Sequence, residues 1–73
     1  MKIEEFIKHL ESKGYEIFRK EDTYIELWKQ NPWRKITRYT DTEVYKIEDY
    51  DGDLFFGKIE SLEQFDLIDR LTN

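Results

Sequence analysis

Residues 24–39 read YIELWKQNPWRKITRY, and this stretch decides the fold. Two strand-like runs flank Gln30-Asn31-Pro32, which contains the only proline in the chain. The first run alternates apolar and polar residues, and the second is rich in β-branched and aromatic residues. Alternation with a period of two is typical of strands, and Asn-Pro is typical of turns. The stretch therefore predicts an antiparallel hairpin with strands over residues 24–29 and 33–39. In the first of these strands, Ile25 and Leu27 share one face, and Trp28 lies on the other.

The chain begins with a pattern of helical period. Ile3, Phe6, Ile7 and Leu10 recur at the spacing i, i+3, i+4, i+7, which predicts an amphipathic helix over residues 2–13. Gly14 follows, and glycine readily adopts the left-handed conformation that ends a helix.

A second helix is predicted at the other end, over residues 62–71. Residues 61–64 read Ser-Leu-Glu-Gln, a capping box in which the serine hydroxyl caps the first turn and the glutamine reaches back. We expect Phe65, Ile68 and Leu71, with Leu67 alongside, to form its buried side.

Three further strands are predicted over residues 15–20, 44–49 and 54–59. Asp51-Gly52 lies between the last two, and Asp-Gly between apolar runs is a strong hairpin signal because both residues tolerate positive φ. We therefore expect a single α+β domain over residues 1–73. It consists of an N-terminal helix, an antiparallel meander of four or five strands, and a short C-terminal helix.

Composition excludes several classes of protein. The chain of 73 residues has no cysteine, which rules out disulfides and thiolate metal sites. Its opening residues carry acids and contain no apolar run like that of a signal peptide, and no window has the length of a membrane span. We expect a soluble, cytoplasmic protein that has no membrane partner.

Charge is unevenly distributed along the chain. The net charge is -5 overall, +4 over residues 28–39, and -7 over residues 40–73. Spaced carboxylates on a small rigid fold can imitate a nucleic-acid backbone and occupy a basic groove on another protein. The leading interpretation is therefore a non-enzymatic module that docks an acidic face on a basic protein. The residues expected to form that face are Glu48, Asp49, Tyr50, Asp51, Asp53, Phe55, Glu63 and Asp66.

The same acidic hairpin resembles a calcium loop in part. Counted from Asp49, acids stand at places one, three, five and twelve, as in an EF-hand. The sixth place, which requires glycine, is Leu54, and the flanking residues are predicted strands. We therefore interpret this segment as a tight acidic hairpin and expect no metal and no cofactor.

The alternative interpretation is a module that binds single-stranded nucleic acid. Aromatic rings stack on bases while lysine and arginine follow the phosphates, and the basic stretch supplies both kinds of residue. The carboxylates elsewhere in the chain would repel phosphate, which favours the protein-docking interpretation. The residues of this alternative site are Trp28, Lys29, Trp33, Arg34, Lys35, Arg38 and Tyr39.

Enzymatic chemistry has little support in the sequence. A nucleophile needs an oriented base, and His9, the only histidine, lies on the flank of the first helix with no partner nearby in sequence. We therefore expect no catalytic residues.

In length, acidity and order of elements, the chain resembles the small proteins of phages and other mobile elements. Many of these inhibit a host nucleic-acid enzyme, so the resemblance implies an inhibitor or regulator. A homodimer closed through an edge strand of the meander is a third hypothesis, because open edges invite pairing.

Overall fold

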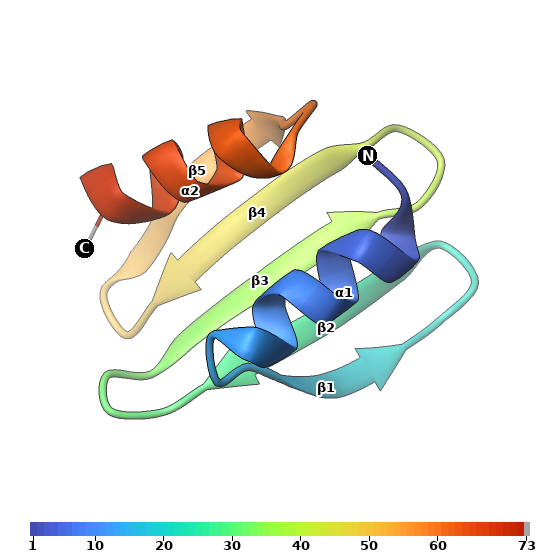
Figure 1. Cartoon of the computed structure of the whole chain (residues 1–73). Coiled ribbons are helices and arrows are strands. Elements are labelled where there is room, and N and C mark those ends of the chain that lie inside the picture. Colours follow the sequence, from blue (N-terminus) through green and yellow to red (C-terminus); the bar gives the residue numbers. More distant parts are fainter. Residues whose placement is uncertain (73) are drawn as a thin grey trace.

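The computed structural model describes residues 1–72 and confirms the α+β meander (Figure 1). The five strands form one antiparallel sheet in the order β1-β2-β3-β4-β5. The elements are α1 (Ile3–Ser12), β1 (Glu16–Lys20), β2 (Tyr24–Lys29), β3 (Arg34–Tyr39), β4 (Val44–Asp49), β5 (Gly52–Lys58) and α2 (Leu62–Leu71).

Both helices lie on the same face of the sheet (Figure 1). The strands alternate, so every second side chain points towards the helices and the core forms between the two layers. Phe6 of α1 is at its centre, with its ring 5.0 Å from that of Tyr45 and 5.6 Å from that of Phe65. The buried apolar residues are Phe6, Leu10, Tyr15, Ile25, Leu27, Ile36, Tyr45, Ile47, Ile59 and Phe65.

The predicted glycine at the end of α1 and the predicted serine cap of α2 are confirmed. Gly14 follows α1 with φ of 93°, a conformation that glycine adopts without steric cost. At the start of α2, the Gln64 backbone N–H donates to Ser61 Oγ at 3.1 Å. The Gln64 side chain reaches back one residue further than a capping box requires, and its Oε1 accepts from the Glu60 N–H at 2.9 Å.

The turn between β4 and β5 differs from the expected Asp-Gly turn. Asp49 pairs with Gly52, so Tyr50 and Asp51 are the two residues of the loop. Gly52 has φ of 128°, whereas Asp51 has no positive φ. The glycine therefore supplies the left-handed residue just after the turn, and β5 begins at Gly52 instead of at residue 54.

The buried side of α2 also differs from the prediction. Phe65 is buried and Ile68 packs against the core, but Leu71 is 75% exposed and Leu67 is also exposed. Asp69 takes the inward position instead, with 7% of its surface exposed. The helix is turned in this way because Asp69 pairs with a buried arginine of β3.

Both edge strands are irregular. The register of β1 against β2 shifts between Ile17 and Arg19, and that of β5 against β4 shifts opposite Ile47 and Glu48. Bulges at sheet edges twist the strand and hinder pairing with another chain. The irregular edges therefore favour contact with other molecules through a face of the sheet over contact through its edges.

Candidate functional site

The sheet face opposite the helices bears an aromatic group at one end. Strand register places Tyr24, Tyr39 and Val44 side by side across β2, β3 and β4. Phe56 of β5 completes the group, and Tyr39 is its centre, with ring centroids 6.5 Å from Tyr24 and 6.3 Å from Phe56. Phe56 is 66% exposed, so this group presents apolar surface to solvent.

A second aromatic pair lies on the same face, on β1 and β2. The rings of Phe18 and Trp28 are 4.9 Å apart, and Phe18 is exposed on the edge strand. Arg19 lies 5.9 Å from the centre of the Phe18 ring. We refer to Tyr24, Tyr39, Val44 and Phe56 as the aromatic patch, and to Phe18 and Trp28 as the edge pair.

Between them, the helix-free face carries a row of alternating charges. Lys35 Nζ lies 3.1 Å from Glu26 and 3.6 Å from Glu48, and Lys46 Nζ lies 4.0 Å from Glu48 and 3.7 Å from Asp53. Burial lowers the pKa of Lys35, but its hydrogen bonds to Glu26 and Glu48 outweigh burial, so the pKa is raised. Lys35 therefore stays charged. The row contains three carboxylates and two lysines, and each carboxylate lies within 4.0 Å of a lysine.

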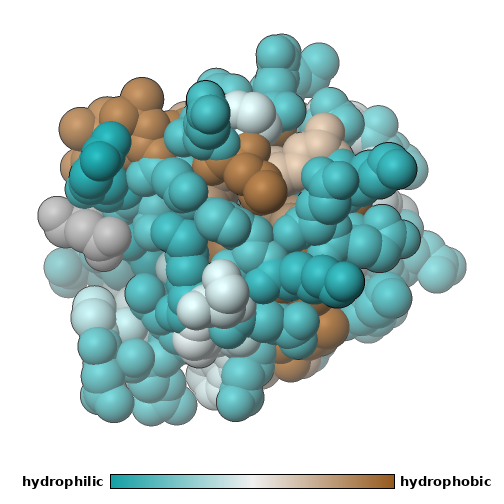
Figure 2. Space-filling model, in the orientation of Figure 1, coloured by the Kyte–Doolittle hydropathy of each residue, from teal (hydrophilic) through white to brown (hydrophobic). Residues whose placement is uncertain are grey.

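The helix side of the molecule has a different character. It is largely hydrophilic, and apolar atoms show chiefly at the upper left of Figure 2, on the side of α2. The exposed apolar residues of that helix are Leu67 and Leu71.

The structure separates the residues of the predicted acidic face. Glu48 and Asp53 belong to the charge row, where lysines neutralise them. Phe55 packs against the hydrophobic core under the helices. Glu63 and Asp66 are on α2, on the helix side of the molecule. The eight residues therefore do not form one continuous surface.

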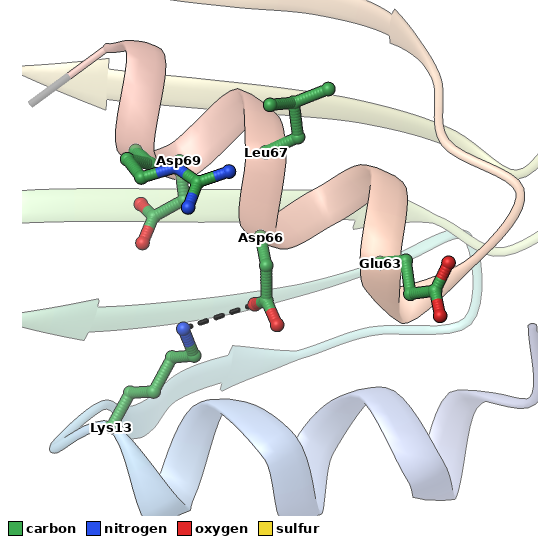
Figure 3. A pocket seen from close by; sticks show the side chains of 6 residues that line it. Lys13, Glu63, Asp66, Leu67 and Asp69 are labelled. Atoms are coloured by element: carbon green, nitrogen blue, oxygen red, sulfur yellow. Dashed lines mark ion pairs between the residues drawn. The ribbon is translucent and has the colours of Figure 1, made fainter.

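Asp66 joins the two helices. Its Oδ1 lies 2.7 Å from His9 Nε2 and 3.0 Å from Lys13 Nζ, and Figure 3 shows Asp66 and Lys13 facing each other across the space between the helices. The hydrogen bond from His9, together with Lys13, lowers the pKa of Asp66 although partial burial opposes the shift. His9 therefore has a partner, which lies 57 residues away in sequence.

At the β4–β5 turn, Tyr50 and Asp51 are exposed and Asp49 is half-buried. Tyr50 is 83% exposed, and its ring lies 5.4 Å from that of Trp33 in the neighbouring turn. Asp49 Oδ1 accepts from the Asp51 N–H at 2.8 Å. Within residues 1–72, neither Asp49 nor Asp51 is in an ion pair.

The structure also divides the predicted nucleic-acid site. Arg34 and Arg38 are 3% and 6% exposed, so neither can reach a phosphate on a bound strand. They point towards the helices because they share a strand face with Ile36, which belongs to the core. The expectation that these arginines belong to a basic surface is wrong.

The other residues of that predicted site are dispersed. Lys35 and Tyr39 lie on the helix-free face, where Lys35 is paired with acids, and Trp28 belongs to the edge pair. Lys29 Nζ lies 4.9 Å from the Tyr15 ring, and Trp33 packs against Tyr50. No continuous track of cations accompanies the aromatic rings.

Each buried arginine lies under one of the helices. Arg34 Nη1 donates to Asp69 Oδ1 at 3.0 Å, and Arg34 Nη2 donates to the carbonyl and hydroxyl oxygens of Thr72 at 2.9 and 2.8 Å. Arg38 Nη2 donates to the Met1 carbonyl at 3.1 Å, and its guanidinium lies 5.7 Å from the Tyr45 ring centre. These arginines anchor the ends of the chain to the sheet.

The aromatic patch was not recognised in the sequence as a site. Alternation along β2 already places Tyr24 with Trp28, and the same rule along β3 separates Tyr39 and Lys35 from Arg34 and Arg38. When the same alternation is applied to all the strands, it identifies the residues of the helix-free face. The contribution of Phe56 depends on the bulge in β5, for which the sequence carries no clear signal.

Comparison of the chain with protein-family models, with curated proteins and with solved structures gave no match. Within residues 1–72, no group of three or more His, Asp or Glu side chains is placed to hold a metal ion. Neither α1 nor α2, the helices of this described part, is long and apolar enough to cross a membrane.

Proposed function

We propose that the protein is a non-enzymatic binding module that docks on another protein through the helix-free face of its sheet. The observation that carries the proposal is the exposed aromatic surface of that face, formed by the aromatic patch and the edge pair. Aromatic side chains supply much of the binding energy at protein interfaces when they are desolvated there. In the charge row between them, each carboxylate lies within 4.0 Å of a lysine, so these charges are already paired when they enter an interface.

A partner with a basic surface fits the charge of the molecule. The net charge of -5 attracts a positive surface over a distance and raises the association rate, while aromatic contacts supply affinity. An inhibitor or regulator of a nucleic-acid-handling protein is the form of activity that we propose. The proposal contains no catalytic step.

The proposal is tested by capture of partners from a nuclease-treated lysate of the source cell. Tagged wild-type protein is compared with the double variant Phe18→Lys/Phe56→Lys, which places charge in both aromatic groups. Leu71→Lys is the matched control, because Leu71 is also an exposed apolar residue but lies on the helix side. Circular dichroism and urea unfolding verify that all three proteins fold.

We expect the wild type and Leu71→Lys to retain the same stoichiometric protein, and the double variant to lose it. Retention should weaken as salt is raised, because screening removes the attraction between the opposite net charges. Equal retention by the double variant contradicts the proposal. Loss of all captured protein on nuclease treatment, with nucleic acid recovered directly, favours the nucleic-acid alternative.

A further inference from the structure

The helix-free face has a hollow beside the aromatic patch. The hollow has a volume of about 330 Å³ and lies where the β1–β2 and β3–β4 turns meet the sheet. Its lining is mostly apolar and consists of Thr23, Tyr39, Asp41, Thr42, Val44 and Phe56. This volume is at the lower end of the range for ligand sites, which suits one large side chain of a partner.

The walls of the hollow are fixed by contacts within the protein. The Thr40 N–H and hydroxyl donate to the carbonyl oxygens of Thr23 and Asp22, each at 3.0 Å, and so tie the two turns together. The terminal amine of Met1 lies 3.6 Å from Glu43 and holds the second turn from its other end. A preformed wall lowers the entropy cost of binding.

The hollow has acidic residues on the side of the turns and a lysine on the side of β5. Asp41 lines it, and Asp22 adjoins the lining residue Thr23; within residues 1–72 neither carboxylate is in an ion pair. This distinguishes them from Glu26, Glu48 and Asp53 on the same face, each of which lies within 4.0 Å of a lysine. On the opposite side of the hollow, Lys58 is the cross-strand neighbour of Val44. A cation is therefore favoured on the side of the turns and opposed on the side of β5.

We propose that the hollow binds a large apolar side chain of the partner protein, and that Asp22 and Asp41 bind a lysine or arginine next to it. The inference rests on the proposed function, since it names the chemistry by which that partner is recognised. The apolar side chain fills the hollow against Tyr39, Val44 and Phe56. The neighbouring cation makes the specific contact, because a free carboxylate beside an apolar surface discriminates between cations and anions.

The probe that tests this inference is a random heptapeptide library displayed on phage and selected on the immobilised protein. We expect the enriched peptides to contain a large apolar residue next to Lys or Arg. Synthetic versions are then titrated into ¹⁵N-labelled protein, where the amide resonances of Thr23, Thr42 and Val44 should shift. Selection of no peptide, or of peptides without this pair, overturns the inference.

Two single variants separate the apolar from the charged contact. Phe56→Lys should weaken the selected peptide at least about tenfold, as expected for an aromatic anchor. Asp41→Asn should weaken it about threefold to tenfold but should not affect the same peptide with its cation replaced by glutamine. Leu71→Lys should bind like the wild type. An equal effect of Asp41→Asn on both peptides contradicts the ionic contact.

The partner from the capture experiment distinguishes failure of this inference from failure of the proposed function. Phe18→Lys alone charges the edge pair, and Phe56→Lys alone charges the hollow. If the partner is lost with Phe18→Lys and kept with Phe56→Lys, docking through the helix-free face stands and the hollow is not its site. Sedimentation of the free protein tests a second copy as occupant, and a dimer that Phe56→Lys dissociates overturns the inference.

Discussion

Arg34 and Arg38 occupy equivalent positions on one strand but differ in how their charges are compensated. Both are buried on the helix-covered face of β3, one under α2 and one under the start of α1. Arg34 has a carboxylate partner and two oxygens of Thr72, whereas Arg38 has the Met1 carbonyl and the face of an aromatic ring. Arg38 Nε and Nη1 are buried and have no hydrogen-bond partner among residues 1–72.

The comparison shows that a buried arginine affects stability in opposite ways at the two positions. A buried ion pair with its hydrogen bonds satisfied becomes strongly destabilising when one partner is removed. A buried guanidinium with unsatisfied donors already carries a desolvation cost in the native state. Arg34 therefore contributes to stability on the α2 side of the core, whereas Arg38 on the α1 side costs free energy in the folded state.

The largest effect is expected at Asp69. Asp69→Ala removes the carboxylate that lies 3.0 Å from Arg34 Nη1 and should lower the free energy of unfolding by about 3–5 kcal/mol. In a chain of this size, this loss is a large part of the total stability. Urea unfolding followed by tryptophan fluorescence measures it. The double variant Arg34→Met/Asp69→Leu should recover most of the loss. A loss below about 1 kcal/mol for Asp69→Ala would show that water compensates Arg34.

Arg38→Met should change stability much less. Methionine fills a similar apolar volume and removes two unsatisfied donors, so we expect a change within about 1 kcal/mol, or a gain. The same urea measurement applies, with Arg34→Met as the matched variant on the same strand. If Arg38→Met cost as much as Arg34→Met, the two arginines would be equally compensated and the comparison would fail.

Alkaline pH tests the surroundings of Arg38 by another route. Burial raises the pKa of the neighbouring Tyr45 to about 12, with Arg38 opposing the shift and Glu43 adding to it. The folded protein therefore holds this proton more tightly than the unfolded chain, whose tyrosines titrate near 10. The contribution is complete below about pH 10 and is lost as the pH rises towards 12.

Tyr45→Phe should remove part of this alkaline loss, by about 1–2 kcal/mol between pH 9 and pH 12. Burial also raises the pKa of Tyr15, so the remainder of the loss should persist in the variant. At pH 7 the variant should be as stable as the wild type, because the Tyr45 hydroxyl has no hydrogen-bond partner in the described part of the chain. Identical alkaline profiles for the two proteins would contradict the assignment to Tyr45.

The smallest effect is expected at Asp66, three residues before Asp69 and much more exposed. Asp66→Asn should lower stability by only about 0.5 kcal/mol at pH 7, because solvent screens its ion pairs. The pKa of Asp66 is lowered in the fold by its bond to His9 and by Lys13, so its contribution is present above about pH 4 and is lost on acidification. The difference between wild type and Asp66→Asn in urea should therefore vanish near pH 3. A difference that persisted there would show that Asp66 acts through packing.

Much of the fold was predictable from local pattern. The stripe of Phe6 and Leu10, the alternation in β2 and the serine cap at Ser61 each depend on a few neighbouring residues, and the structure confirms them. The inward position of Asp69 was not predictable in this way, because it depends on Arg34, which lies 35 residues away. The same reason explains why Leu71 was wrongly expected to be buried.

The candidate site was predictable only in part. Counting charge along residues 28–39 combined side chains of both strand faces, and so grouped Arg34 and Arg38 with Lys35. In a strand, every second residue lies on the same face. Arg34 and Arg38 therefore share the face of Ile36, which points into the core. The pairing of Lys35 with Glu48 and the hollow beside Phe56 depend on strand order, which the periodicity of a single strand does not contain.

The order of the strands also has a consequence for the speed of folding. Every hydrogen-bonded strand pair joins neighbours in sequence, so the sheet closes only short loops, and contact between the two helices spans the greatest distance along the chain. Low contact order favours fast folding, and contacts that form late affect chiefly the unfolding rate. In stopped-flow experiments, we expect Asp66→Asn to accelerate unfolding and to leave the refolding rate unchanged. Slower refolding of the variant would show that the helices dock before the sheet forms. If the refolding rate is unchanged, the docking of the two helices determines how slowly the protein unfolds, and the sheet forms before the helices dock.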